Sequence, residues 1–138
     1  MKARAERFIV VHAADKENWG YNEETLPILL TLVDSFGPDQ RFFSHTGVVG
    51  YFRTSSQKVG VVKSMVGQLE TLQSSDERFS YLGIGVAEGE LIGKFNWFGR
   101  LVGRESLFGS ANNEAARNLQ IPGAFTESLN EIERRLEP

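Results

Sequence analysis

The sequence has 138 residues, of which 41% are hydrophobic and 24% charged, and this balance predicts one globular domain over residues 1–138. The net charge of −3 comes without a basic block, so we expect no large nucleic-acid surface, and no apolar run approaches the ~20 residues of a membrane span. The absence of cysteine excludes disulfides and thiolate metal sites, and a reducing compartment such as the cytoplasm fits it.

The first half of the chain predicts a strand, a helix and a hairpin. The β-branched run over 8–11 is typical of a buried strand. The leucine and valine spacing over 26–33 predicts an amphipathic helix. The apolar stretches 41–44 and 48–52 flank His45-Thr46-Gly47, which predicts a β-hairpin with a tight turn.

The middle of the chain predicts a long helix and a further strand. Thr54 or Ser55 is expected to cap the helix, whose apolar positions between 59 and 72 recur at steps of three and four. Residues 79–86 alternate loosely and predict a strand. The order β, α, β, β, α, β then predicts an α+β fold with a ferredoxin-like core, an antiparallel four-stranded sheet with two helices on one face.

The remaining residues form a C-terminal extension beyond this core. The glycine- and aromatic-rich stretch 95–108 predicts a second hairpin. Residues 112–119 and 126–136 predict two helices, which Pro122-Gly123 separates.

Two motifs in the second half suggest a function. Gly83 to Leu91 reads GIGVAEGEL, and Gly109 to Arg117 reads GSANNEAAR. Catalytic domains of class III nucleotide cyclases carry a strand G-I-x-x-x-x-G-E and, further along, a helix G-D-x-x-N-x-A-A-R. The chain resembles that family over roughly residues 42–127. The resemblance implies the palm-type variant of the ferredoxin-like fold.

The resemblance implies roles for two residues of the second motif. Asn113 takes the place of the asparagine that orients the ribose, and Arg117 that of the arginine that stabilises charge on the phosphates. The two lie four apart, hence on one face of a helix, and an arginine fork suits phosphate oxygens. The alternative is that Asn113 is a helix cap and Arg117 a solvated or ion-paired side chain.

The family also holds Mg²⁺ or Mn²⁺ with two carboxylates. The resemblance places Asp15 at the first metal position and Thr46, in the hairpin turn, at the second. A threonine hydroxyl is neutral and is a poor replacement for a carboxylate.

The family's base-recognising residues are also replaced in this sequence. By position, Ser110 stands for an aspartate and Phe42 for a lysine, while Arg41 should point to the other face of its strand. We therefore expect a degenerate cyclase-like domain that binds a nucleoside triphosphate or cyclic nucleotide, or that dimerises. The alternative is an active cyclase with altered base choice that also uses Glu88.

Other side chains permit further interpretations. Glu88 and Glu90 flank Gly89 at the expected end of a strand, where we expect a solvated turn. The two histidines of the chain allow a His12/Asp15/His45 cluster as a hydrolytic or metal site.

The aromatic residues suggest two kinds of partner. Residues 94–100 hold three aromatics in four positions, and we expect this arm to contribute to a homodimer. Residues 46–52 partly resemble the aromatic segment of RNA-recognition motifs, which keeps an RNA-binding or protein-interaction module as an alternative. Valine and glycine occupy two of the positions at which that motif stacks bases.

Overall fold

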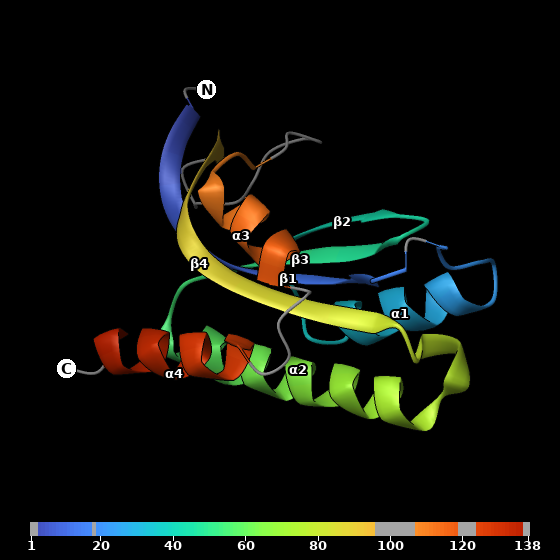
Figure 1. Cartoon of the computed structure of the whole chain (residues 1–138). Coiled ribbons are helices and arrows are strands. Elements are labelled where there is room, and N and C mark those ends of the chain that lie inside the picture. The colour runs from blue at the N-terminus through green and yellow to red at the C-terminus, as the bar shows by residue number, and fades with distance from the viewer. Residues whose placement is uncertain (1–2, 18, 96–106, 119–123, 137–138) are drawn as a thin grey trace.

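The computed structural model describes residues 3–17, 19–95, 107–118 and 124–136. The elements in chain order are β1 (Ala3–Asp15), α1 (Thr25–Asp34), β2 (Gln40–Ser44), β3 (Gly47–Arg53), α2 (Ser56–Ser75), the short 3₁₀ helix η1 (Glu77–Phe79), β4 (Leu82–Lys94), α3 (Ser110–Asn118) and α4 (Ala124–Leu136). The predicted βαββαβ order is confirmed, and both predicted C-terminal helices are present (Figure 1). The predicted second hairpin lies mostly outside the described residues.

The four strands form one antiparallel sheet in the order β2-β3-β1-β4. β1 is central and pairs with β4 along its whole length, from Ala3 opposite Lys94 to Asp15 opposite Leu82. The far half of β1 also pairs with β3, from Phe8 opposite Arg53 to Ala14 opposite Gly47. At each end of β1, segments that are distant in sequence therefore lie side by side.

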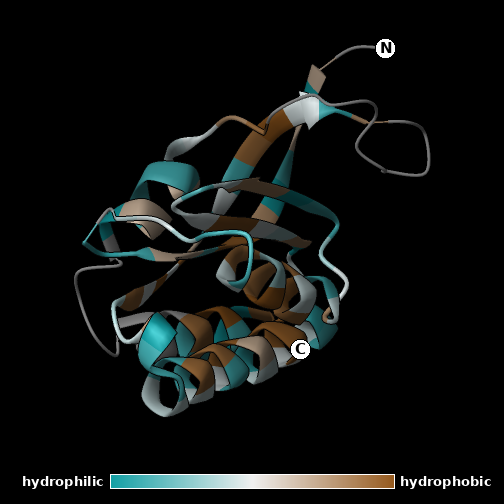
Figure 2. Cartoon of the chain, turned by 90° about the vertical axis from the view of Figure 1, so that its right-hand side faces the viewer, coloured by the Kyte–Doolittle hydropathy of each residue, from teal (hydrophilic) through white to brown (hydrophobic). Residues whose placement is uncertain are grey.

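One face of the sheet packs on a layer of three helices. Side chains alternate along a strand, so Ile9, Val11 and Ala13 of β1 share this face. They pack with the inward sides of α1, α2 and α4, and Figure 1 shows these helices on the same side of the sheet. Figure 2 shows the apolar segments of strands and helices facing one another in this layer. The core is larger than predicted, because α4 joins the two helices expected there.

The opposite face carries α3. Phe8 and Val10 of β1 belong to a second apolar cluster that includes Ala111 and Ala115 of α3. In Figure 1, α3 lies across the sheet from α1, α2 and α4. The helix that carries the second motif is therefore set apart from the main helical layer.

Helix α2 begins as predicted. Ser55 has an extended backbone, and its side chain accepts a hydrogen bond from the Lys58 backbone N–H at 3.1 Å. This capping bond satisfies one of the free N–H groups in the first turn. Among the described residues, no helix is both long and apolar enough to cross a membrane.

The prediction for the fourth strand was wrong at both ends. The sequence pattern placed it at 79–86, whereas β4 is Leu82–Lys94 and Phe79 lies in η1. Phe79 is fully buried against Tyr21, with ring centroids 5.3 Å apart, so its hydrophobicity reflects core packing and not a strand. Beyond residue 86 the polar, glycine-containing sequence stays extended because β1 supplies a partner at every position.

Candidate functional site

The end of β1 meets the β2–β3 turn at one corner of the sheet. The Asp15 backbone N–H donates to the Thr46 carbonyl at 2.9 Å, and the Tyr21 N–H donates to the His45 carbonyl at 2.5 Å. The two positions that the family resemblance linked to metal are therefore neighbours here. A metal site shared by these two positions would require that proximity.

The Asp15 carboxylate is buried and partnered. The residue is 7% exposed, and its two side-chain oxygens accept the backbone N–H groups of Glu17 at 2.9 Å and Gly20 at 2.8 Å. Gly20 has a φ of 85°, and an added Cβ there would lie 2.8 Å from the His45 ring. A glycine is thus required where the loop passes the hairpin turn.

The side chains at this corner do not fit a two-magnesium site. Magnesium prefers carboxylate and water oxygens in near-octahedral geometry. Asp15 is the one carboxylate that the resemblance leaves here, and Thr46 supplies a neutral hydroxyl that shares a 2.8 Å hydrogen bond with Ser44. Over the part of the chain that the structure describes, no group of three or more His, Cys, Asp or Glu side chains could hold a metal ion.

The structure does not form the His12/Asp15/His45 cluster that the sequence allowed as an alternative. By alternation His12 lies on the α3 side of the sheet, paired in register with Val49 and Gly85, and burial lowers its pKa. His45 is exposed in the hairpin turn, whereas Asp15 is buried behind it. The three side chains therefore do not converge among the described residues.

Helix α3 packs on β4 through small residues. Ala111 and Ala115 are buried, and a Cβ added at Gly89 would lie 3.5 Å from the Ala111 Cβ. This close packing leaves the opposite side of the helix in solvent, and both Asn113 and Arg117 are exposed there. The structure thus presents the predicted nucleotide-binding pair together at the surface.

Asn112 has a structural role that the sequence analysis missed. Its side-chain oxygen accepts a hydrogen bond from the Tyr51 hydroxyl at 2.7 Å, and its side-chain nitrogen donates to the Leu107 carbonyl at 2.8 Å. Burial raises the pKa of Tyr51, which keeps the phenol in its donating form. The two adjacent asparagines therefore differ in role, since Asn112 fixes the helix to its neighbours and Asn113 faces solvent. Their one-residue offset on a helix surface is the signal that could have separated them.

The two predicted base-pocket positions lie on different elements. Ser110 is the first residue of α3 and is exposed. Phe42 is half-buried on β2 and meets the Tyr51 ring edge-on, with centroids 5.8 Å apart. Arg41 points to the opposite face, as predicted, and pairs with Asp34 of α1 at 2.8 Å. Phe42 and Ser110 therefore offer an apolar ring and a neutral hydroxyl, and neither supplies a charge.

The prediction that Glu88 and Glu90 lie in a turn was wrong for both, and of the two only Glu90 is exposed to solvent as expected. They are in the middle of β4, and the Glu88 side chain is only 4% exposed. Both Arg7 and Arg135 donate to its carboxylate, at 2.7–2.8 Å. Burial raises the pKa of Glu88, but the two arginines outweigh it and hold that pKa below its usual range. A carboxylate held in this way is poorly suited to bind a metal ion.

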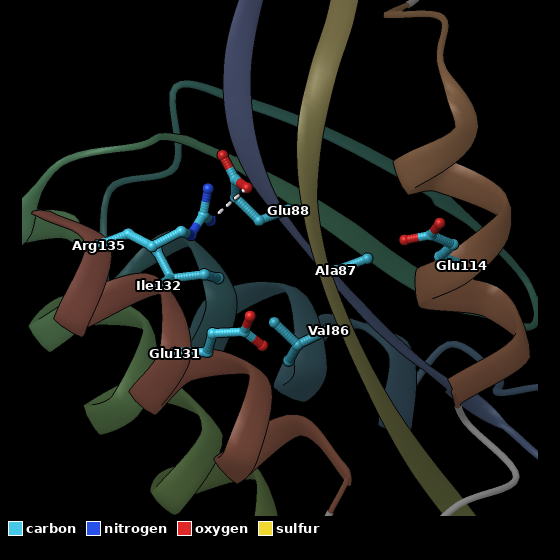
Figure 3. Close-up of a pocket in the computed structure, with 7 residues that line it drawn as sticks. All are labelled: Val86, Ala87, Glu88, Glu114, Glu131, Ile132 and Arg135. Carbon is cyan, nitrogen blue, oxygen red and sulfur yellow. Dashed lines mark hydrogen bonds and ion pairs between the residues drawn. The ribbon is translucent and has the colours of Figure 1, made fainter.

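A cavity of about 330 Å³ opens beside Glu88. Its lining residues are Val86, Ala87, Glu88, Glu114, Glu131, Ile132 and Arg135. Figure 3 shows Glu114 coming from α3 on one side of β4, and Glu131 and Arg135 coming from α4 on the other. Because three carboxylates face one guanidinium that is already paired, the cavity is unfavourable for a phosphate group.

A second cavity of about 440 Å³ lies between α1 and β2. Its lining residues are Tyr21, Asn22, Glu23, Leu26, Pro27, Leu30 and Phe43. The lining is mainly apolar and its one charged residue is acidic, so this cavity is also unfavourable for a phosphate group. The exposed face of α3 remains the better candidate for contact with an anion.

Solved structures share this fold. Two structures of a bacterial light-regulated adenylyl cyclase align with TM-scores of 0.51 at 16% identity; each covers 88% of this chain and 43% or 42% of its own. The guanylyl cyclase Cya2 aligns with a TM-score of 0.54 at 14% identity, covering 87% of this chain and 72% of its own.

These alignments establish the predicted fold class, an α+β domain of the cyclase and palm type. The chain spans less than half the length of the adenylyl cyclase chains. No protein-family model matches the sequence, and a sequence comparison with curated proteins gives no match. At identities of this size the likeness extends to the fold alone.

Proposed function

We propose that this chain is a degenerate cyclase-like domain that binds a nucleotide and has weak or no cyclase activity. The observation that carries the proposal is the contrast between two parts of the molecule. Helix α3 presents Asn113 and Arg117 in solvent. At the corner where β1 meets the β2–β3 turn, by contrast, the neighbour of Asp15 is Thr46, whose side chain is neutral. Groups suited to ribose and phosphate are retained, and groups suited to two-metal chemistry are reduced.

Arg117 is the proposed phosphate contact. Its guanidinium keeps its charge at any physiological pH and can bind two phosphate oxygens at once. It lies in the last turn of α3, with its side chain exposed. Asn113, one turn earlier, offers an amide that can both donate to and accept from ribose hydroxyls. Together they favour a nucleotide over a free base.

The substituted positions explain why we expect little catalysis and little base discrimination. Two magnesium ions activate an attacking hydroxyl and neutralise a leaving pyrophosphate when carboxylates hold them in place. Asp15 alone does not supply that set of carboxylates. Phe42 and Ser110 carry no charge with which to distinguish the polar edges of bases.

A thermal-shift measurement tests the proposal. We expect at least one of the four ribonucleoside triphosphates to raise the melting temperature, since a ligand at a hundred times its dissociation constant adds about 2.7 kcal/mol of stability. Arg117→Ala should abolish the shift, while Arg134→Ala, which removes an exposed arginine of α4, should leave it unchanged.

Two results would contradict the proposal. No shift with any triphosphate would remove the nucleotide-binding role. Robust Mg²⁺- or Mn²⁺-dependent turnover would instead support the alternative, an active nucleotidyl cyclase.

Dimerisation is the second part of the proposal. Ile92 is 51% exposed and Phe108 is 65% exposed, and their backbones exchange hydrogen bonds of 2.7 and 3.0 Å. Two large apolar side chains are thus held side by side at the base of the segment that the sequence analysis assigned to a homodimer arm. Paired exposed apolar groups of this kind support an interface.

The RNA-binding alternative has less support. Tyr51 and Phe52 of β3 are 6% and 0% exposed, because the first lies beneath α3 and the second in the main core. Base stacking requires accessible aromatic faces. The β3 segment lacks them.

A further inference from the structure

The Asp15 carboxylate closes the loop that follows β1. Its two oxygens accept N–H groups two and five residues ahead, those of Glu17 and Gly20. Hydrogen bonds to an ionised acceptor are stronger than those between neutral groups. One buried side chain therefore holds both the start of the loop and its far side.

The closed loop is also fixed to the hairpin turn. The Tyr21 N–H reaches the His45 carbonyl, and the Asp15 N–H reaches the Thr46 carbonyl. Gly20 passes so close to the turn that any side chain would meet the His45 ring at 2.8 Å. The loop and the turn thus form one packed unit that is tied at three points.

A cation at Asp15 would have to compete with this unit. Each N–H group occupies one lone pair of a carboxylate oxygen and brings partial positive charge next to it, which disfavours a cation at the same oxygens. Because Asp15 is 7% exposed, a metal ion with its waters would reach those oxygens only after the loop had moved away.

We propose that Asp15 is a positioning residue that ties Glu17 and Gly20 of the loop after β1 to the hairpin turn, and that the domain binds nucleotides without a divalent cation at this corner. The second clause rests on the proposed function. Phosphate charge is then met by the guanidinium of Arg117, and the metal position of the cyclase family has become a structural tether.

Amide hydrogen exchange followed by NMR tests the tether. In the wild-type protein the Glu17 and Gly20 amides should be protected, and in Asp15→Ala they should exchange about tenfold faster or more, with a melting temperature lowered by roughly 5–10 °C. Asp15→Asn keeps one acceptor oxygen and should protect one of the two amides. Glu17→Gln changes a neighbouring exposed carboxylate without touching the tether and should leave both amides protected. Unprotected Glu17 and Gly20 amides in the wild-type protein would contradict the proposed positioning role of Asp15.

Adding Mn²⁺ without nucleotide to the wild-type protein tests whether a divalent cation binds near Asp15. This test does not depend on the folding of a variant. We expect millimolar Mn²⁺ to leave the NMR signals of Glu17, Gly20 and Thr46 unbroadened. Selective broadening of these signals that disappears in Asp15→Asn would show a cation site at Asp15 and would contradict the proposed absence of a divalent cation there.

Nucleotide binding in EDTA separates the two proposals. We expect the thermal shift with triphosphate in EDTA to equal the shift in Mn²⁺. A shift that requires Mn²⁺ and is lost in Asp15→Asn would overturn the metal-independent mode while leaving nucleotide binding intact. No shift under either condition would reject the proposed function and the metal-independent mode with it, while amide exchange would still decide the role of Asp15.

Discussion

At the scale of single residues, Glu88 connects four parts of the fold. Arg7 from β1, Arg135 from α4 and Thr54 at the end of β3 all donate hydrogen bonds to its carboxylate on β4. The carboxylate is nearly buried, while the two arginines keep about half of their side-chain surface in water. Removing the carboxylate charge leaves both guanidinium groups with a weaker acceptor.

We expect Glu88→Gln to lower the free energy of unfolding by roughly 1–2 kcal/mol, because its charge-assisted hydrogen bonds weaken while both arginines stay half in water. Urea denaturation at neutral pH measures this loss. Glu90→Gln is the matched control, since Glu90 is exposed on the same strand. Its effect should stay within about 0.5 kcal/mol, and equal losses in the two variants would contradict the structural role of Glu88.

The same residue gives a pH dependence with a defined sign. The pKa of Glu88 is lower in the folded protein than its usual value, so the unfolded chain binds the proton more readily. Its contribution to stability is therefore complete above about pH 5 and is lost as pH falls through the folded pKa. Glu88→Gln should flatten this acid decline relative to the wild-type protein.

At the scale of elements, α3 depends on close contact with β4. A Cβ added at Gly109, just before the helix, would lie 2.5 Å from the Glu90 carbonyl oxygen and 2.6 Å from a Leu91 methyl. At Gly89, beneath the helix, an added Cβ would make an ordinary 3.5 Å contact with Ala111. The two glycines therefore differ in the room that they leave.

We expect Gly109→Ala to cost about 1–3 kcal/mol, because backbone must move to relieve the overlap. The same shift would move the start of α3, so nucleotide-induced stabilisation should weaken as well. Gly89→Ala should be tolerated. Urea denaturation and the thermal-shift assay on the two variants provide the comparison. If both variants behaved alike, close packing at the start of α3 would not be what positions this helix.

At the scale of the whole molecule, the exposed large apolar side chains of the described residues lie at the two ends of the sheet. Ile92 and Phe108 lie at the end where β4 finishes, while Trp19 and Phe43 lie near the Asp15 corner. The proposed interface uses the first pair.

Sedimentation velocity tests this proposal. We expect the wild-type protein to sediment as a dimer and Phe108→Glu as a monomer, because a charge in an apolar interface is costly to bury. Trp19→Ser removes an exposed aromatic at the opposite end and should leave the dimer intact. A wild-type monomer at all concentrations would contradict the interface.

Local patterns in the sequence were enough to predict the order of elements and the helix that carries the second motif. Three of the signals were local: the apolar spacing of α1 and α2, the Ser55 cap, and the turn residues of the hairpin. The structure has both helices and the hairpin where these signals predicted them. The spacing of Asn113 and Arg117 likewise fixed their common helix face before any packing was known. The likeness in fold to adenylyl and guanylyl cyclases agrees with the predicted order of elements.

The positions of the charged groups depend on contacts between distant segments, which local patterns do not contain. Glu88 looked like a turn residue because its neighbours are polar and flexible, yet pairing with β1 keeps it in a strand and α4 brings Arg135 to it. Asp15 matched a metal motif, but its acceptors are satisfied by N–H groups whose positions depend on the loop and the hairpin together. Burial and hydrogen-bond partners arise from segments distant in sequence, and a carboxylate's role depends on both.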